Sequence, residues 1–258
     1  TPFFSDIQGF STISEGLTPE ELVQLLNEYL TAMCDLISSY HGTIDKFEGD
    51  AIIAFWGAPL ELPNHATVAC HAAIDMQKKN EEMRKTLREQ NRPMLYTRMG
   101  MSSGPVVVGN MGSADRMDYT MMGDVVNLAA RLEGVNKFYQ TFTMISQSTY
   151  DLTKDDIDTR QLDVIRVVGK KEPISVYEVL ERKNQTSSEK SGVVEKYLKA
   201  LKLYEERNFA DASKEFEKVL AIDPDDGPSL TYVKRCGVFL ETPPEKDWDG
   251  VYTFTEKG

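Results

Sequence analysis

Two acidic side chains lie where the surrounding sequence is apolar. Asp6 closes an apolar strand predicted over residues 3–7, and Asp50 lies at the tip of a hairpin predicted over residues 43–56. An isolated carboxylate in apolar surroundings is costly, so each needs a partner. The ordinary alternative is that each caps a turn. Because no His or Cys lies nearby, a partner ion would be a hard cation with oxygen ligands, Mg²⁺ or Mn²⁺.

A second polar pair interrupts an apolar helix. Residues 119–133 are predicted to form a short strand, a tight turn at Gly123 and a helix with an apolar body. Asn127 and Arg131 are four residues apart in this helix, so their side chains project from the same face. Such a pair is either a salt-bridged surface edge or a functional site, and the helix alone leaves both interpretations open.

The elements that must position these residues follow from the apolar pattern. Helices are expected over 18–41, from the capping-box signature of Thr18 and Glu21, over 65–90, and after Ser146. Residues 8–11 are expected to form a turn. Strands are expected over 3–7, 43–56 as a hairpin, 96–101 and 106–109 joined by a turn at 103–105, 141–145, 163–168 and 174–180. This order lacks the regularity of a doubly wound sheet. We predict an α+β sandwich with the sheet on one side and the helices on the other.

The chain changes character after residue 182, which we take as the end of the first domain, 1–182. Residues 183–192 are polar without apolar periodicity and are predicted to be a linker. Residues 193–242 match a tetratricopeptide-like helical pattern, and the tail, 243–258, contains Trp248 and Tyr252. One repeat cannot bury its apolar face alone. It must pack on the first domain, on a second copy or on a protein partner, and its role is either structural or partner binding.

The overall composition excludes one class of partner. The 258 residues carry 41 acidic and 29 basic side chains, a net charge of −12, which argues against binding a nucleic-acid backbone. Cys34, Cys70 and Cys236 show no metal spacing and are predicted to be reduced in the cytoplasm. No apolar run approaches a membrane span. The chain starts inside an apolar strand without Met, so we expect further sequence upstream, with a sensor or regulatory domain.

Three motifs, at residues 4–10, 46–50 and 123–131, together resemble the catalytic domain of class III nucleotidyl cyclases, and the resemblance covers about residues 1–181. It implies the ferredoxin-like palm fold of that family. It also implies a reaction in which the ribose 3′-hydroxyl of a nucleoside triphosphate attacks its own α-phosphorus and expels pyrophosphate. Two divalent metal ions, Mg²⁺ or Mn²⁺, are the implied cofactors.

The resemblance also implies where metal and phosphates bind. The metal ligands would be Asp6, Asp50 and the main-chain carbonyl of Ile7. The β- and γ-phosphates would accept hydrogen bonds from the main chain at Gly9, Phe10 and Ser11. Lys170 aligns with a family lysine that touches the terminal phosphates, and a solvated loop lysine is the alternative.

Catalysis and base choice are implied at four further positions. Arg131 would stabilise the charge that grows on the α-phosphate, and Asn127 would orient the ribose. Lys46 would donate to adenine N1, and Thr120 would accept from the 6-amino group. Guanylyl cyclases carry Glu and Cys at these two positions, so ATP is the implied substrate. Thr120 departs from the commonest Asp and resembles the subgroup that includes bicarbonate-responsive cyclases.

In this family the metal carboxylates come from one subunit and the base, ribose and phosphate residues from the other. The chain contains both sets, which implies a head-to-tail homodimer with two equivalent sites. Guanylyl or mixed cyclase activity is one rival interpretation, because Thr120 permits it. A catalytically silent scaffold is another, although it should lack at least one catalytic residue. A dinucleotide cyclase should carry a Gly-Gly-Asp/Glu-Glu-Phe hairpin where this chain has residues 47–50.

Overall fold

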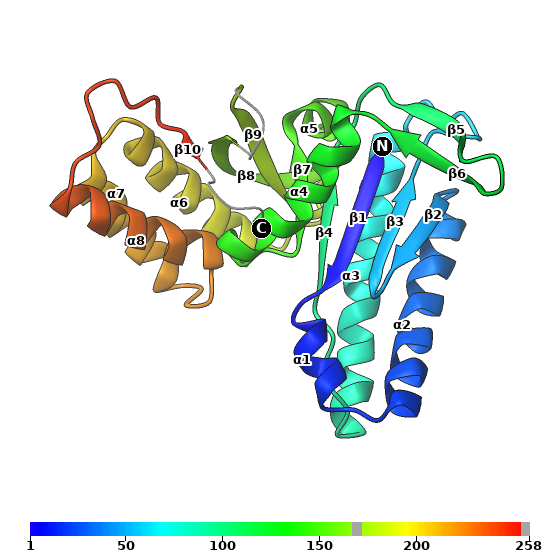
Figure 1. Ribbon diagram of the computed structural model, residues 1–258. Coiled ribbons are helices and arrows are strands. Elements are labelled where there is room, and N and C mark those ends of the chain that lie inside the picture. Colours follow the sequence, from blue (N-terminus) through cyan, green and yellow to red (C-terminus); the bar gives the residue numbers. More distant parts are fainter. Residues whose placement is uncertain (167–171, 254–258) are drawn as a thin grey trace.

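The computed structural model describes residues 1–166 and 172–253. It shows a large sheet and, formed by the C-terminal part of the chain, a group of helices beside it (Figure 1). The strands are β1 (Pro2–Ile7), β2 (Thr43–Glu48), β3 (Ala51–Phe55), β4 (Thr97–Met101), β5 (Val107–Gly112), β6 (Met117–Met122), β7 (Thr143–Ser146), β8 (Ile157–Arg166), β9 (Ile174–Arg182) and β10 (Tyr252–Thr253). The helices are α1 (Phe10–Glu15), α2 (Pro19–Ser39), α3 (His65–Glu89), α4 (Asp124–Tyr139), α5 (Gln147–Thr153), α6 (Ser188–Glu205), α7 (Phe209–Leu220) and α8 (Gly227–Glu241). The predicted α+β class is confirmed.

Strand β1 lies inside the large sheet. Across the described residues, the strand order of this sheet is β10-β8-β9-β7-β4-β1-β3-β2. β1 pairs antiparallel with both β3 and β4, and its register with β4 sets Asp6 opposite Arg98. The hairpin predicted over 43–56 is present as β2 and β3. Because β1 and β3 are antiparallel, the end of β1 and the tip of this hairpin lie at the same end of the sheet.

Helices cover both faces of the sheet. α2 and α3 pack on one face, where Met99 and Met101 of β4 enter the core. α4 crosses the other face at Gly100, where a Cβ atom would lie 2.3 Å from the carbonyl oxygen of Ala129. Only glycine permits an approach this close. The prediction that the helices lie on one side of the sheet is therefore wrong, because Gly100 leaves room for α4 on the second face.

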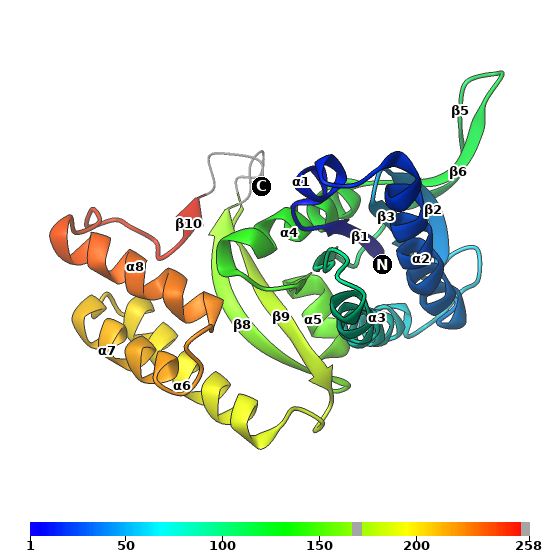
Figure 2. The same cartoon turned by 90° about the horizontal axis from the view of Figure 1, so that it is seen from below.

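The strand predicted over 106–109 does not pair with the strand predicted over 96–101. Instead β5 pairs with β6 in a two-stranded arm that projects from the body of the molecule (Figure 2). Both edges of β4 are occupied, by β1 and β7, so β4 has no free edge for β5. The turn predicted over 8–11 is present at residues 8–9, whereas residues 10–11 begin the short helix α1.

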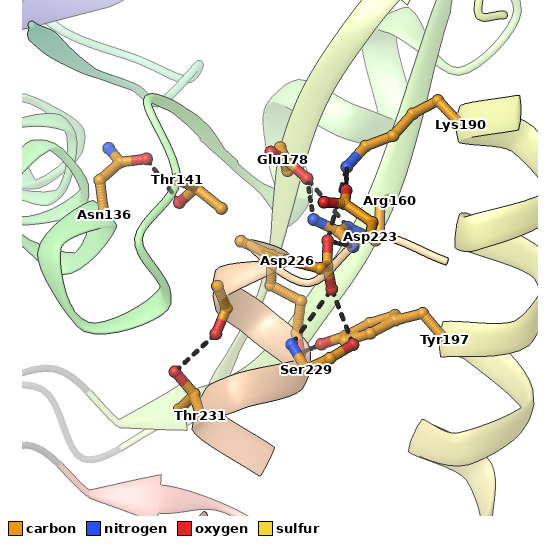
Figure 3. A network of polar contacts seen from close by, with 12 residues as sticks. Asn136, Thr141, Arg160, Glu178, Lys190, Tyr197, Asp223, Asp226, Ser229 and Thr231 are labelled. Carbon is orange, nitrogen blue, oxygen red and sulfur yellow. Dashed lines mark hydrogen bonds and ion pairs between the residues drawn. The ribbon is translucent and has the colours of Figure 1, made fainter. Parts of the chain in front are cut away.

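The C-terminal helices pack against the large sheet and α4. α6, α7 and α8 share one apolar core with residues of β8 and α4. The hydroxyls of Tyr197 and Tyr232 both donate to the main-chain oxygen of Leu162, at 2.8 and 3.0 Å. Arg160 of β8, with a side chain 1% exposed, pairs with Asp226 at the start of α8 at 2.6 Å (Figure 3). The helical segment is thus anchored by both apolar and ionic contacts.

The segment predicted as a linker, 183–192, overlaps the start of α6. α6 begins at Ser188, because the side chain of Ser187 accepts from the N–H of Lys190 at 3.2 Å and caps the helix. In the tail, the ring centroid of Trp248 lies 5.1 Å from that of Phe239 in α8, so the tail covers part of the helical segment. Among the helices of the described residues, none has the length and apolar character needed to cross a bilayer.

Candidate active site

Asp6 and Asp50 meet at one end of the sheet. Asp6 lies near the end of β1, and Asp50 follows the Gly49 turn directly before β3. The N–H of Ile7 donates to Asp50 Oδ2 at 2.9 Å, which ties the hairpin tip to β1. Burial raises the pKa of Asp50 to about 6; the Ile7 hydrogen bond opposes this rise and the nearby Asp6 carboxyl adds to it. The site thus holds two carboxyls that repel each other when both are ionised.

These residues fit a divalent cation. In the parts of the chain that the structure describes, no group of three His, Cys, Asp or Glu side chains could hold a metal ion. Asp6 and Asp50 would therefore supply two ligands, and the others would be main-chain, substrate or water oxygens. The predicted main-chain ligand, Ile7, lies next to both carboxyls. An all-oxygen set that includes two carboxylates suits Mg²⁺ or Mn²⁺.

Arg98 and Glu133 extend this cluster, and neither was predicted from the sequence. Arg98 lies on β4 opposite Asp6, with its guanidinium 3.4 Å from Asp6 Oδ2 and 2.9 Å from Glu133 Oε1. Burial raises the pKa of Glu133 to about 7; Arg98 opposes the rise, while Asp6 and Asp50 add to it. The signal available in the sequence was a single arginine in an otherwise uncharged strand. Arg98 gives the acidic site a local positive charge.

A second cluster brings Lys46 and Thr120 together. Lys46 is on β2 and Thr120 on β6, and Asp45 lies between them. The Thr120 hydroxyl donates to Asp45 Oδ2 at 2.6 Å, and Lys46 Nζ is 3.6 Å from Asp45 Oδ1. The Asp45 side chain is 3% exposed and that of Lys46 is 40% exposed. The cluster thus presents a partly exposed amine and a hydroxyl side by side. Asp45, which joins them, was not predicted from the sequence.

Asn127 and Arg131 lie one turn apart on α4, as predicted. Asn127 is exposed and Arg131 half-buried. Within residues 1–166 and 172–253, no ion pair or side-chain hydrogen bond engages the Arg131 guanidinium, and none links Asn127 or Arg131 to Asp6 or Asp50. The salt-bridged surface edge that was the alternative for this pair is therefore not what the described residues form. Arg131 has its charge available for an anion.

The predicted phosphate-binding segment starts a helix. Gly9 precedes α1 with φ 68°, a left-handed conformation that favours glycine, while a Cβ there would meet nothing within 4 Å. Glycine is therefore required for backbone conformation and not for space. Phe10 and Ser11 follow in the first turn of α1, where main-chain N–H groups lack helical partners. Lys170, the last predicted phosphate residue, lies outside the described residues.

Comparison with known proteins identifies the first 181 residues. They match the family model described as the adenylate and guanylate cyclase catalytic domain, over residues 1–181. Adenylate cyclase 1 of Rhizobium meliloti is 38% identical over 180 residues, which is 70% of this chain and 27% of that protein. The adenylate cyclase of Anabaena cylindrica is 36% identical over 186 residues, 69% of this chain and 36% of that protein. The chain thus spans about a third or less of these relatives.

Solved structures agree with this match. The adenylyl cyclase CyaB from P. aeruginosa is 39% identical with a TM-score of 0.66, and the alignment covers 72% of this chain and 95% of that one. The guanylyl cyclase Cya2 is 33% identical with a TM-score of 0.64, covering 71% of this chain and 92% of that one. With a family model that matches well over half of its residues, this chain belongs to the adenylate and guanylate cyclase catalytic-domain family.

Proposed function

We propose that this chain is the catalytic part of an adenylyl cyclase, which converts ATP to 3′,5′-cyclic AMP and pyrophosphate. The observation that carries the proposal is the Lys46–Asp45–Thr120 cluster. It sets an amine donor beside a hydroxyl, from segments far apart in the chain, as adenine N1 and the 6-amino group require. The adenylate cyclases among the relatives support the same substrate.

Asp6, Asp50 and the carbonyl of Ile7 would hold two divalent ions. When bound, these ions would neutralise the triphosphate and lower the pKa of the ribose 3′-hydroxyl. Asp50 is suited to this role because burial and Asp6 raise its pKa to about 6, so the metal-free site is electrostatically strained at neutral pH. Arg98, 3.4 Å from Asp6, partly offsets the negative charge that ATP would meet on approach.

The remaining residues would bind and stabilise the triphosphate. Main-chain N–H groups from Gly9 to Ser11 would bind the β- and γ-phosphates. Asn127 would hold the ribose, and Arg131 would stabilise the charge that develops on the α-phosphate as the 3′-oxygen attacks. An arginine suits this role because its planar guanidinium stays charged and matches phosphate oxygens. The lack of an ion-pair partner for Arg131 within the described residues leaves its charge for substrate.

A head-to-tail homodimer would unite the two clusters. In one chain, the described contacts join Asp6 to Asp50 and Lys46 to Thr120, but neither pair to Arg131. The β5–β6 arm supports an interface, because Val107, Met117 and Met122 are 67%, 61% and 61% exposed on it. Exposed apolar side chains of this size on a projecting arm are typical of contact surfaces. Each dimer would then contain two equivalent active sites in the cytoplasm.

Guanylyl cyclase activity is the second candidate. The guanylyl cyclase Cya2 shares the fold of this chain with a TM-score of 0.64.

The relatives extend well beyond the region that they share with this chain. On that ground, the proposal includes a sensor or regulatory domain elsewhere in the protein. It also includes a protein partner for the tetratricopeptide-like helices.

A paired assay tests the proposed function. The purified chain is supplied with ATP or GTP, and with Mg²⁺ or Mn²⁺, and the cyclic product is identified by mass. We expect cyclic AMP from the parent chain and none from Asp50→Ala. Asp155→Ala, which removes an exposed carboxylate outside the site, should retain full activity. Cyclic GMP as the main product would favour the second candidate, and no product under any condition would indicate a silent homologue.

A further inference from the structure

The Thr120 hydroxyl is committed as a donor. It has a single proton, and this proton goes to Asp45 Oδ2 across a 2.6 Å hydrogen bond. The Asp45 side chain is 3% exposed, so water has little access to compete for the bond. The other oxygen, Oδ1, is buried without a hydrogen-bond partner in the described residues, and its nearest cation is Lys46 at 3.6 Å.

The consequence concerns which bases the hydroxyl can read. With its proton held by Asp45, Thr120 Oγ1 has only lone pairs to present to a ligand. Adenine carries an amino group at position 6, which donates to such an oxygen. Guanine and hypoxanthine carry an oxygen there, which would face Oγ1 as a second acceptor. The threonine alone would be indifferent between them, because a free hydroxyl can donate or accept.

We infer that Asp45 is a positioning residue that locks Thr120 as a hydrogen-bond acceptor and so excludes 6-oxopurine nucleotides. The inference rests on the proposed function, in which Thr120 faces position 6 of the base. Asp45 is too buried to touch the base itself and acts through the Thr120 hydroxyl.

Breaking the Thr120–Asp45 hydrogen bond so that Thr120 can donate to a 6-oxopurine is unfavourable. Turning the Thr120 proton toward the base would leave Asp45 with neither oxygen hydrogen-bonded in a nearly closed environment. Leaving a buried acceptor of this kind without a hydrogen bond lowers an equilibrium constant or a specificity ratio by about 10-fold to 100-fold. The pair can therefore supply selectivity that a lone threonine would lack.

A double-mutant cycle on selectivity tests this role. Asp45→Ala, Thr120→Val and the double variant are compared with the parent chain, using kcat/KM for ATP and for inosine triphosphate. Inosine triphosphate differs from ATP only at position 6 and N1. We expect Asp45→Ala to lower the ATP-to-ITP ratio about 10-fold, because the freed hydroxyl can donate to the 6-oxygen. In the Thr120→Val background the same substitution should change the ratio less than about 2-fold.

Asp45→Asn is the second variant and preserves size. Lys46 beside Oδ1 favours the amide oxygen at that position, which turns the amide NH₂ toward Thr120. The NH₂ would donate to the hydroxyl and release its proton, so the ATP-to-ITP ratio should fall here too. This variant decides the question if Asp45→Ala does not fold, as judged by circular dichroism.

Three results would overturn the inference. The first is a parental ratio in both Asp45 variants. The second is a fall in the ATP-to-ITP ratio on Asp45 substitution that is equally large with and without the Thr120 hydroxyl, because Asp45 would then act through Lys46 and not through Thr120. The third is an unchanged ratio in Thr120→Val. A parent chain that makes no cyclic AMP is a different outcome, because it rejects the proposed function before any variant is compared.

Discussion

Replacing Asp50 with asparagine should stabilise the metal-free protein while abolishing its activity. Burial, and then Asp6, raise the pKa of Asp50 from 3.8 to about 6, so the folded state disfavours the ionised carboxylate. The full shift corresponds to about 3 kcal/mol. Because the side chain is half-buried, solvent screening reduces this to about 1 kcal/mol. Asparagine removes the charge and keeps an oxygen that can accept from Ile7, a bond of 2.9 Å in the parent.

The sign of the pH dependence follows from the raised pKa. The protonated carboxyl favours folding, so its contribution is fully present below pH 3.8 and is lost as the pH rises through about 6. Asparagine does not titrate. The stability advantage of Asp50→Asn should therefore be absent near pH 4, grow between about pH 4 and 6 and stay constant above about pH 7. For a chain of this size, about 1 kcal/mol corresponds to about 2–4 °C in Tm.

Thermal unfolding in EDTA from pH 4 to 8 measures this difference. Added Mg²⁺ or Mn²⁺ should raise the Tm of the parent chain and leave that of Asp50→Asn unchanged. Asp155→Asn, which neutralises an exposed carboxylate, serves as the matched control and should follow the parent. A lower Tm for Asp50→Asn at pH 7.5 in EDTA, or a difference independent of pH, would refute the reasoning.

Three further predictions address catalysis, assembly and folding. Arg131→Ala should lower kcat about 10²–10³-fold in steady-state assays, whereas Arg88→Ala, at an exposed position of α3, should not. Equimolar mixing of inactive Asp50→Ala and Arg131→Ala chains should restore about a quarter of parental activity, because half the dimers would each hold one intact site; no recovery would contradict the shared site. Arg160→Ala should lower the free energy of unfolding in urea by about 3 kcal/mol, because the buried Asp226 loses its closest cation and keeps only Lys190, at 3.4 Å, as an ion-pair partner.

Features that depend on neighbouring residues were predictable from the sequence. The capping box at Thr18 and Glu21 is present, with hydrogen bonds of 3.3 and 2.9 Å in the two directions. α3 begins at His65 as predicted, and Ser146 caps the short helix α5. These features arise from hydrogen bonds and side-chain spacing within one or two turns, so local sequence specifies them. The 4-residue spacing of Asn127 and Arg131 on α4 belongs to the same group.

Features that depend on which strand edges are free were not predictable. The pairing of β5 with β6 follows from the occupation of both edges of β4, which no local pattern reports. The placement of α4 on the second face depends on Gly100, whose missing Cβ matters only once the helix is above it. In both cases the deciding fact is the position of a distant segment.

The sequence by itself determined the chemistry available to this protein, and the tertiary structure decided which groups act together. Residue types and spacing singled out Asp6, Asp50, Asn127 and Arg131 as candidates, and the family resemblance added Lys46 and Thr120, because motif and helical periodicity are properties of the chain. Asp45 and Arg98 gained their significance only from strand pairing and packing. These set Arg98 beside Asp6 and bring β6 against β2, so that a buried carboxylate holds the proton of Thr120.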